Sequence, residues 1–386
     1  MKLSELLNNV KINEQIGNSN PDISSVHFDS RQVEKDSLFI AQKGTQADGH
    51  RFIEASIQSG AIAVICEEKP ENISDLVVYI VVDNSAIAMG TIASNLYGNP
   101  TGKLKLVGIT GTNGKTTTAT LTYNLFESLG YATALVSTIR ILINGKEIPT
   151  GHTTPDILTL NKIFKQAVDA GCEYAVMEVS SIGIHQHRIA GLNFELGIFS
   201  NITHDHLDYH KTFAEYLKVK KSFFDSLPKT SSALTNIDDK NGVVMVQNTA
   251  AKRYSYALKS NADFKAKILE NRFDGMLLTI DGKELWTSLI GKFNAYNILA
   301  VYATAMILGF DQEEVLTKLS NLGKVDGRFQ SYITQSGLIT IVDYVHTPDA
   351  LENVLSTIQN IRAGKEKLIT VVGCGGDRDK TKRPEL

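Results

Sequence analysis

One short segment, residues 104–118, limits what this chain can fold into more than any other. An apolar run over residues 104–109 leads into a glycine turn, after which we predict a helix over residues 115–129. A strand, a glycine loop, Lys-Thr and a helix form a nucleotide-phosphate site, because backbone N–H groups and the helix N-terminus face the anion. In such a site Lys115 reaches the outer phosphates and the Thr116 hydroxyl holds Mg²⁺. The alternative is a glycine turn that binds nothing.

Alternating strands and helices indicate an α/β protein with a parallel sheet wrapped by helices. A turn-rich segment at residues 98–102 indicates a boundary, and we divide the chain into residues 1–98, 99–327 and 328–386. In the middle part we expect strands at residues 104–109, 132–137, 174–179, 196–201 and 233–235, a hairpin at 141–148 and a β-meander over 265–290. Helices are expected there at residues 115–129, 157–170, 212–227 and 293–308.

The last part of the chain has few predicted elements. We expect a strand at residues 338–343, a helix at 348–362 and a strand at 367–372. Two strands and one helix are too few for an α/β domain, so we expect the C-terminus to be incomplete.

Size and composition restrict the class of protein. The chain has 386 residues, enough for two or three domains, and its net charge of −3 argues against a general nucleic-acid binder. Its cysteines, Cys66, Cys172 and Cys374, are widely spaced, which suits a reducing compartment. We find no signal peptide and no apolar run near the ~20 residues that cross a membrane. We therefore expect a cytoplasmic protein with neither nucleic-acid nor membrane partners.

Polar residues follow two further predicted strands. Glu178 ends the strand at 174–179, and residues 201–210 hold three histidines and two aspartates. Ligands of open parallel sheets bind at the carboxyl ends of strands, so Glu178 could hold Mg²⁺ and the histidine segment could bind metal or phosphate. The alternatives are an acid that caps a loop and a solvated polar loop.

Lys220 falls on the apolar face of the helix predicted at residues 212–227. At about 100° per residue, aromatic and leucine side chains surround it, whereas Lys218 and Glu215 lie on the far side. An unpaired ammonium is costly there. Either the side chain extends to the surface, or it is a buried functional lysine, with chemical modification as one option.

Taken together, these motifs resemble the Mur ligases, ATP-dependent enzymes that add amino acids to the UDP-N-acetylmuramoyl peptide precursor of the bacterial cell wall. Five residues separate Gly108 from Gly114, one more than in the common loop, and this is the family's own spacing. The resemblance extends over nearly the whole chain, and its other motifs lie at residues 29–31, 38–41, 46–50, 153–156, 178–181, 205–208, 291–294, 327–328 and 343–349.

The resemblance implies an architecture of three domains. A small N-terminal α/β domain binds the UDP precursor, a central parallel-sheet domain binds ATP, and a Rossmann-like C-terminal domain, truncated here, binds the amino acid. It further implies ATP and Mg²⁺ as cofactors, a CO₂-derived carbamate on Lys220, and a monomer.

Site residues are carried over position by position. The resemblance assigns ATP to Gly111, Thr112, Asn113, Gly114, Lys115, Thr116, Thr117, Asn294, Arg328 and Asp343. It assigns the muramoyl precursor to Phe28, Ser30, Thr45, Gln46, Ala47, Thr153, Thr154, Ser180, Gln186 and Arg188, and the incoming amino acid to Arg378. Metal is assigned to Thr116, Glu178, His206 and carbamylated Lys220, and catalysis to Lys115, Lys220 and His206.

The implied reaction adds meso-diaminopimelate to UDP-MurNAc-L-Ala-D-Glu through an acyl phosphate. The choice of diaminopimelate rests on residues 375–384, which are similar to those of the diaminopimelate-adding members. The alternatives are L-lysine as the third substrate, a sibling ligase of the Mur or folylpolyglutamate type, and a fragment that binds its ligands without turnover.

Overall fold

The computed structural model describes residues 1–44, 47–149, 155–345, 347–362, 364 and 366–373. The chain divides into two compact units. Unit 1 comprises residues 1–103, 155–169 and 185–193, and unit 2 comprises residues 104–154, 170–184 and 194–386. Two later segments of the chain therefore belong to the N-terminal unit.

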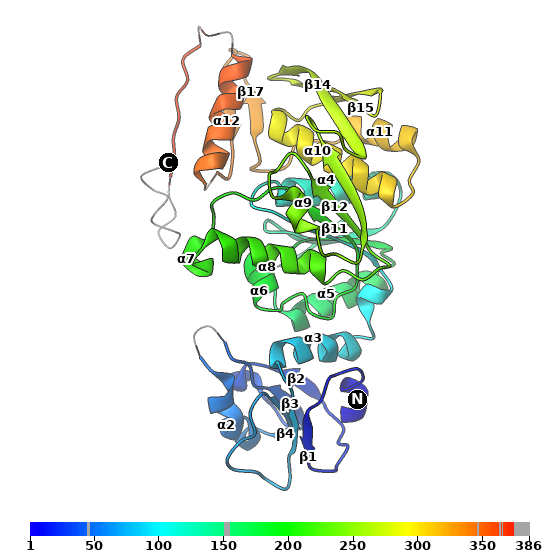
Figure 1. Cartoon of the computed structure of the whole chain (residues 1–386), viewed down its shortest axis with the longest axis vertical. Coiled ribbons are helices and arrows are strands. Elements are labelled where there is room, and N and C mark those ends of the chain that lie inside the picture. The colour runs from blue at the N-terminus through cyan, green and yellow to red at the C-terminus, as the bar shows by residue number, and fades with distance from the viewer. Residues whose placement is uncertain (45–46, 150–154, 346, 363, 365, 374–386) are drawn as a thin grey trace. The chain divides into compact units, whose positions relative to one another are not determined.

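Unit 1 is built on a mostly parallel sheet (Figure 1). Its strands lie in the order β1 (Glu14–Ile16), β5 (Val78–Val81), β4 (Ala61–Cys66), β3 (Ser37–Ile40) and β2 (Ser25–His27), with β1 antiparallel. Its helices are α1 (Leu3–Leu6), α2 (Ile53–Gln58), α3 (Ser85–Leu96) and α5 (Ile157–Asp169), with short 3₁₀ turns at Ser30–Gln32, Gly49–Phe52 and Pro100–Gly102. Phe39, Val64 and Tyr79 are fully buried in its core, as expected for strands covered on both faces.

Unit 2 contains the longer sheet. In spatial order its strands are β16 (Lys283–Thr287), β15 (Gly275–Ile280), β14 (Phe264–Arg272), β13 (Lys252–Ala257), β12 (Ser232–Asn236), β11 (Phe194–Phe199), β6 (Lys105–Thr110), β10 (Tyr174–Glu178), β7 (Thr133–Val136), β8 (Ile141–Ile143) and β9 (Lys146–Ile148). From β14 to β7 neighbouring strands are parallel, and the hairpin and meander at the two ends are antiparallel. The strands, hairpin and meander predicted for this region are confirmed.

The helices predicted for this unit begin and end near their predicted positions. They are α4 (Lys115–Ser128), α8 (Phe213–Asp225), α10 (Lys292–Ile307) and α12 (Pro348–Ile361). The unit also contains α7 (Leu207–His210), α9 (Gly242–Met245) and α11 (Gln312–Ser320), and α6 (Ser181–His185) begins in unit 2 and ends in unit 1. The short helices α6, α7 and α9, and also α11, were not predicted.

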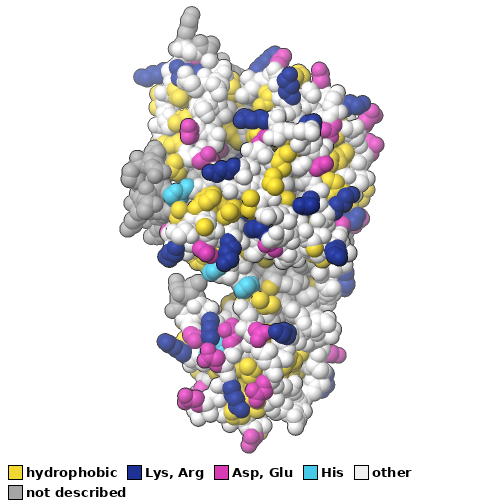
Figure 2. Space-filling view, in the orientation of Figure 1, with side chains coloured by type: hydrophobic (Ala, Val, Ile, Leu, Met, Phe, Trp, Pro, Cys, Tyr) yellow, Lys and Arg dark blue, Asp and Glu magenta, His cyan; other side chains and the backbone are white. Residues whose placement is uncertain are grey.

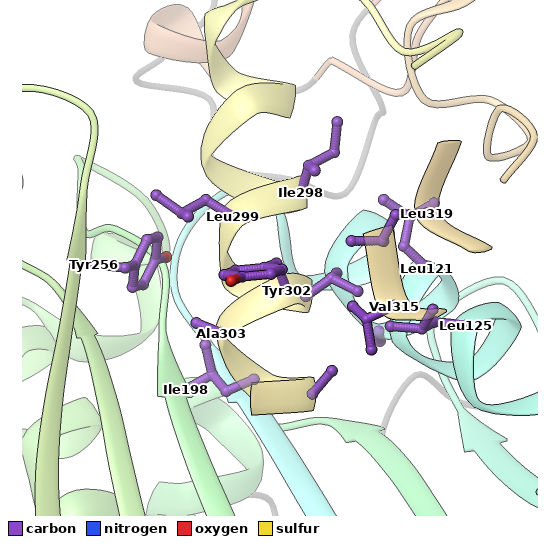
Figure 3. Packing of buried hydrophobic residues seen from close by; sticks show 14 of the residues in the cluster. Leu121, Leu125, Ile198, Tyr256, Ile298, Leu299, Tyr302, Ala303, Val315 and Leu319 are labelled. Atoms are coloured by element: carbon purple, nitrogen blue, oxygen red, sulfur yellow. The ribbon is translucent and has the colours of Figure 1, made fainter. Parts of the chain in front are cut away.

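The two faces of β6 bury different helices, because side chains alternate along a strand. Val107 and Ile109 belong to the same core cluster as residues of α4 and α10, where the Tyr302 ring lies near Leu299 and Ala303 and points toward Tyr256 (Figure 3). On the other face, a Cβ at Gly108 would lie 3.0 Å from the Phe223 ring of α8. The central strand is therefore covered by helices on both sides.

The C-terminal segment departs from prediction at one strand. β18 (Ile339–Val342) and α12 are confirmed, and β18 pairs with β17 (Gln330–Ile333), which was not predicted. Residues 367–372 form no strand, so that prediction was wrong. Val371 is 94% exposed, and a β-rich sequence forms a strand only when a neighbouring strand accepts its backbone hydrogen bonds.

Asp238 ties the loop after β12 to the loop after β13 and to α10. Its carboxylate accepts N–H groups of Leu258, Lys259 and Ser260 at 2.8–2.9 Å and the Tyr296 hydroxyl at 2.8 Å. Burial alone would raise the pKa of this carboxyl, but the hydrogen bonds from Ser260, Tyr296 and the neighbouring N–H groups lower it well below its usual value. The ionised form is therefore the one that the fold stabilises.

Replacing Asp238 with Asn is expected to lower the free energy of unfolding by about 1.5–3 kcal/mol at neutral pH, because a charged acceptor is lost. A carboxyl whose pKa is depressed in the folded state contributes stability above its unfolded pKa and loses it as pH falls through the folded pKa. The difference between wild type and variant should therefore shrink as pH falls below 3.8, the ordinary value. Urea unfolding across pH measures this, and a difference that stays constant with pH would contradict it.

Candidate nucleotide-phosphate site

The glycine loop between β6 and α4 has the backbone of an anion site. Gly114, at the start of α4, has φ +87°, and a Cβ there would lie 2.5 Å from Asn297 Oδ1. A Cβ at Gly111 would overlap the Ser200 hydroxyl. Both positions therefore require glycine. The N–H groups in the first turn of α4 have no acceptor within the helix, and such groups can bind an anion.

The end of β11 fixes the loop from the side. Asn201 Oδ1 accepts the Asn113 N–H at 2.9 Å, and Asn201 Nδ2 donates to the Asn113 carbonyl, also at 2.9 Å. The Ser200 hydroxyl donates to the same carbonyl at 2.7 Å. Sequence reasoning missed Ser200 and Asn201 as site residues. Their place in the sequence could have indicated this role, since they directly follow β11, a strand that pairs with β6.

Two lysines donate to one carbonyl oxygen of the loop. Lys115 Nζ lies 2.8 Å from Gly111 O and 2.9 Å from Thr112 O. Lys220 Nζ lies 2.9 Å from Gly111 O and 3.4 Å from Thr110 Oγ1. Lys220 is 1% exposed, with its ammonium 4.9 Å from the centre of the Tyr216 ring. The side chain is therefore buried and does not extend to the surface.

Burial lowers the pKa of both lysines. Burial, followed by the nearby charge of Lys115, lowers the pKa of Lys220 well below its usual value, although Asp205 opposes the shift. Burial also lowers the pKa of Lys115, against the attraction of Glu178 and Asp205. A buried lysine with a lowered pKa has a larger fraction of neutral, nucleophilic amine.

Carboxylates lie beside the loop, as predicted for Glu178. Glu178 pairs in register with Ile109 of β6 and is 1% exposed. Its two oxygens accept the Thr138 N–H at 2.8 Å and the Thr138 hydroxyl at 3.1 Å. Asp205 is 3% exposed, so the negative charge in this region comes from at least two buried carboxyl groups.

The histidine segment divides between two environments. The His206 side chain is 41% exposed, and its Nε2 lies 3.5 Å from Asp205 Oδ2. His210 is buried, with Nε2 2.9 Å from Ser181 Oγ. Within the described ranges, no three His, Cys, Asp or Glu side chains gather into a metal cluster.

The segment after residue 326 reaches the loop through Arg328. Its Nη2 donates to the Thr116 hydroxyl at 2.9 Å, and the guanidinium lies 5.0 Å from the centre of the Tyr344 ring. Arg328 Nε is buried and has no hydrogen-bond partner among the described residues. Asp343 Oδ2 accepts the Phe329 N–H at 2.5 Å, next to this arginine in the chain. An unpaired guanidinium N–H suits an incoming anionic acceptor.

Asn294 lies on the face of α10 that packs against α4. It is 2% exposed, donates to Ile290 O at 2.8 Å and accepts from Asn297 Nδ2 at 3.1 Å. Asn297 in turn accepts the Thr118 hydroxyl at 3.3 Å. This polar chain connects α10 to the first turns of α4.

The predicted precursor residues fall in both units. Phe28, 38% exposed, and Ser30 lie in unit 1, as do Ala47, Gln186 and Arg188. Ser180 lies in unit 2, where its hydroxyl accepts the Gly183 N–H at 3.0 Å. Outside the described residues are Thr45, Gln46, Thr153, Thr154 and Arg378.

On the face shown in Figure 2, Lys and Arg side chains are interspersed with Asp and Glu among the described residues. No helix in the described part of the chain combines the length and apolar character that a membrane span requires.

Three family domains match the chain in order. They are the Mur ligase family catalytic domain over residues 22–97, the Mur ligase middle domain over 109–305 and the Mur ligase glutamate ligase domain over 327–386.

Individual relatives match along the full length. The chain is 54% identical over 384 residues to a UDP-N-acetylmuramoyl-L-alanyl-D-glutamate–2,6-diaminopimelate ligase of Phocaeicola vulgatus, covering 100% of this chain and 79% of the relative. It is 40% identical over 398 residues to the ligase of the same name from Bacillus velezensis, covering 100% and 80%. A solved structure of a ligase of that name superposes with a TM-score of 0.81 at 30% identity, covering 100% of this chain and 79% of that one. These matches confirm the predicted α/β architecture, and the chain belongs to the Mur ligase family.

Proposed function

We propose that this protein is an ATP-dependent amide ligase that adds meso-diaminopimelate to UDP-MurNAc-L-Ala-D-Glu through an acyl phosphate. The observation that carries the proposal is the phosphate loop with Lys115 and Lys220 on the Gly111 carbonyl. Relatives at 54% identity that bear the name of this ligase support the choice of substrates.

The loop fits a nucleotide triphosphate. Gly111 and Gly114 let the loop backbone pack directly against Ser200 and Asn297, and Arg328 Nε is a buried donor without a partner among the described residues. Residues 111–117 would hold the phosphates, with Lys115 on the outer ones. Asn294, Arg328 and Asp343 would contact the remainder of the nucleotide.

The Thr116 hydroxyl and the Glu178 carboxylate next to the loop are oxygen donors that suit Mg²⁺, which commonly takes only one or two protein carboxylates. These two groups and a ring nitrogen of His206 would hold the ion together with phosphate oxygens. The ion would neutralise charge on the transferred phosphoryl group. Arg328 donates to the Thr116 hydroxyl, so its guanidinium lies next to a proposed metal ligand and within the region where the phosphates would bind.

Lys220 fits a carbamate. Its neutral amine would attack CO₂ and lose a proton, which gives an anion that can ligate metal. The buried position and the neighbouring Lys115 support this modification, because both disfavour a second ammonium on Gly111 O.

The chemistry has two steps. The D-Glu carboxylate attacks the γ-phosphorus of ATP, which forms the acyl phosphate and releases ADP. The amine of the incoming amino acid then attacks the acyl carbon, and phosphate leaves. Lys115 would stabilise the charge that moves in the first step.

The precursor would be held by residues of both units. Phe28, Ser30, Thr45, Gln46 and Ala47 are assigned to the uridine end. The muramoyl peptide is assigned to Thr153, Thr154, Ser180, Gln186 and Arg188, and the amino acid to Arg378. We further infer a cytoplasmic monomer.

ADP release is the test of this function. The protein is supplied with ATP, Mg²⁺ and UDP-MurNAc-L-Ala-D-Glu, and with meso-diaminopimelate or L-lysine in parallel. We expect release that requires both the precursor and diaminopimelate. A preference for lysine would keep the reaction but change the third substrate, and ADP binding without precursor-dependent release would indicate a binding role.

A further inference from the structure

Asn113 is a loop residue whose side chain bonds to a distant segment of the chain. Its N–H and carbonyl are bonded to Asn201, so the end of β11 holds its backbone from one side. The side-chain carboxamide of Asn113 donates from Nδ2 to Asp349 Oδ2 at 3.1 Å. This bond joins positions that are 236 residues apart in the chain.

Asp349 is held in place at the start of α12. Thr347 is fully buried and caps the helix by accepting the Ala350 N–H at 3.3 Å, and Pro348 occupies the first helical position. Burial, and then the charge of Glu352, raise the pKa of the Asp349 carboxyl, whereas the hydrogen bond from Asn113 lowers it. The carboxylate therefore depends on Asn113 for part of its stabilisation.

We propose that Asn113 and Asp349 form a positioning pair, through which the C-terminal segment holds the phosphate loop in its nucleotide-binding orientation. This inference rests on the proposed function. It concerns a contact that persists when nucleotide binds, because neither side-chain group is needed for phosphate or metal. The Arg328–Thr116 contact differs in this respect, since the Thr116 hydroxyl is a proposed metal ligand.

The test compares variants at both ends of the bond with a matched control. Asp349→Ala and Asn113→Ala should each raise the Kd for ADP with Mg²⁺ about fivefold, the effect of one hydrogen bond. Asp349→Asn should stay near wild type, because its Oδ1 can still accept from Asn113. Glu352→Ala removes an exposed carboxylate one turn along the same helix, whose charge raises the pKa of Asp349, so Kd should stay unchanged or fall slightly. Calorimetry measures Kd, and thermal unfolding checks that each variant folds.

The effects of Asp349→Ala and Asn113→Ala on the free energy of ADP binding should not be additive, because both changes break the same hydrogen bond. In the ligase assay the KM for ATP should rise while the KM for the precursor stays constant, a split that general destabilisation would not produce. The pair is refuted if Asp349→Ala binds ADP like Glu352→Ala, if the double variant shows the product of the two effects, or if Asp349→Asn binds as weakly as Asp349→Ala. Failure of wild type to bind ADP would instead refute the proposed function.

Discussion

Replacing Lys115 with methionine is expected to lower kcat/KM for ATP by about 10²–10³-fold, the usual loss when one preorganised charge on the reacting group is removed. Methionine keeps most of the length and volume of the side chain. Ligase turnover, followed as ADP release, and ADP affinity together measure whether the loss lies in chemistry or in binding.

The geometry gives the reason for so large an effect. Lys115 Nζ donates to the carbonyl oxygens of Gly111 and Thr112, so the ammonium already lies against the phosphate loop. Arg328 is another cation near this loop, and its buried Nε has no hydrogen-bond partner among the described residues. Its charge is present in both wild type and variant, so it does not replace the charge that the change at Lys115 removes.

A matched control is Lys105→Met, at the other end of β6. It removes the same charge from an exposed position, next to the Tyr174 hydroxyl at 3.4 Å. Activity close to wild type is expected for it. If Lys115→Met kept more than about a tenth of wild-type kcat/KM, the assignment of Lys115 to the transferred phosphate would be wrong, since a tenfold change corresponds to only about 1.4 kcal/mol.

Local chemistry made the centre of the site predictable. The glycine loop has a sequence signature because the backbone at Gly114 tolerates no Cβ. Helical periodicity placed Lys220 on the apolar face with Tyr216, Phe223 and Phe224, and the structure decided between a buried side chain and one that extends to the surface. Alternating elements likewise predicted the parallel sheet, since each strand of that sheet needs a crossover helix.

Contacts between distant segments were not predictable. Nothing near Asn113 in the sequence indicates that Asn201 and Asp349 bond to it, because these contacts depend on strand order and on the path of the last segment. For the same reason the two lysines on Gly111 O were seen only in the structure. The strand that was wrongly predicted at residues 367–372 shows the reverse case. The local sequence favours a strand, but no strand in the described part of the chain pairs with it.

Replacing Lys220 with methionine is expected to lower kcat by about 10²-fold, because the proposed carbamate, a charged group at the reacting centre, can no longer form. Fold stability should not suffer, since an ammonium 1% exposed is exchanged for an apolar chain of similar volume. Turnover in CO₂-depleted buffer should also fall for wild type and recover when bicarbonate is added. Neither treatment should affect the variant.

A direct observation separates the carbamate from an unmodified buried lysine. In buffer with ¹³C-labelled bicarbonate, wild type should show a carbamate ¹³C resonance that Lys220→Met lacks. Lys218→Met, on the exposed side of the same helix, should keep both the resonance and the activity. An unmodified Lys220, whose pKa is lowered by burial and by Lys115, would serve only to hold Gly111 O. An unmodified lysine predicts no carbamate ¹³C signal and no dependence of turnover on bicarbonate. These two results together would exclude the carbamate as a metal ligand.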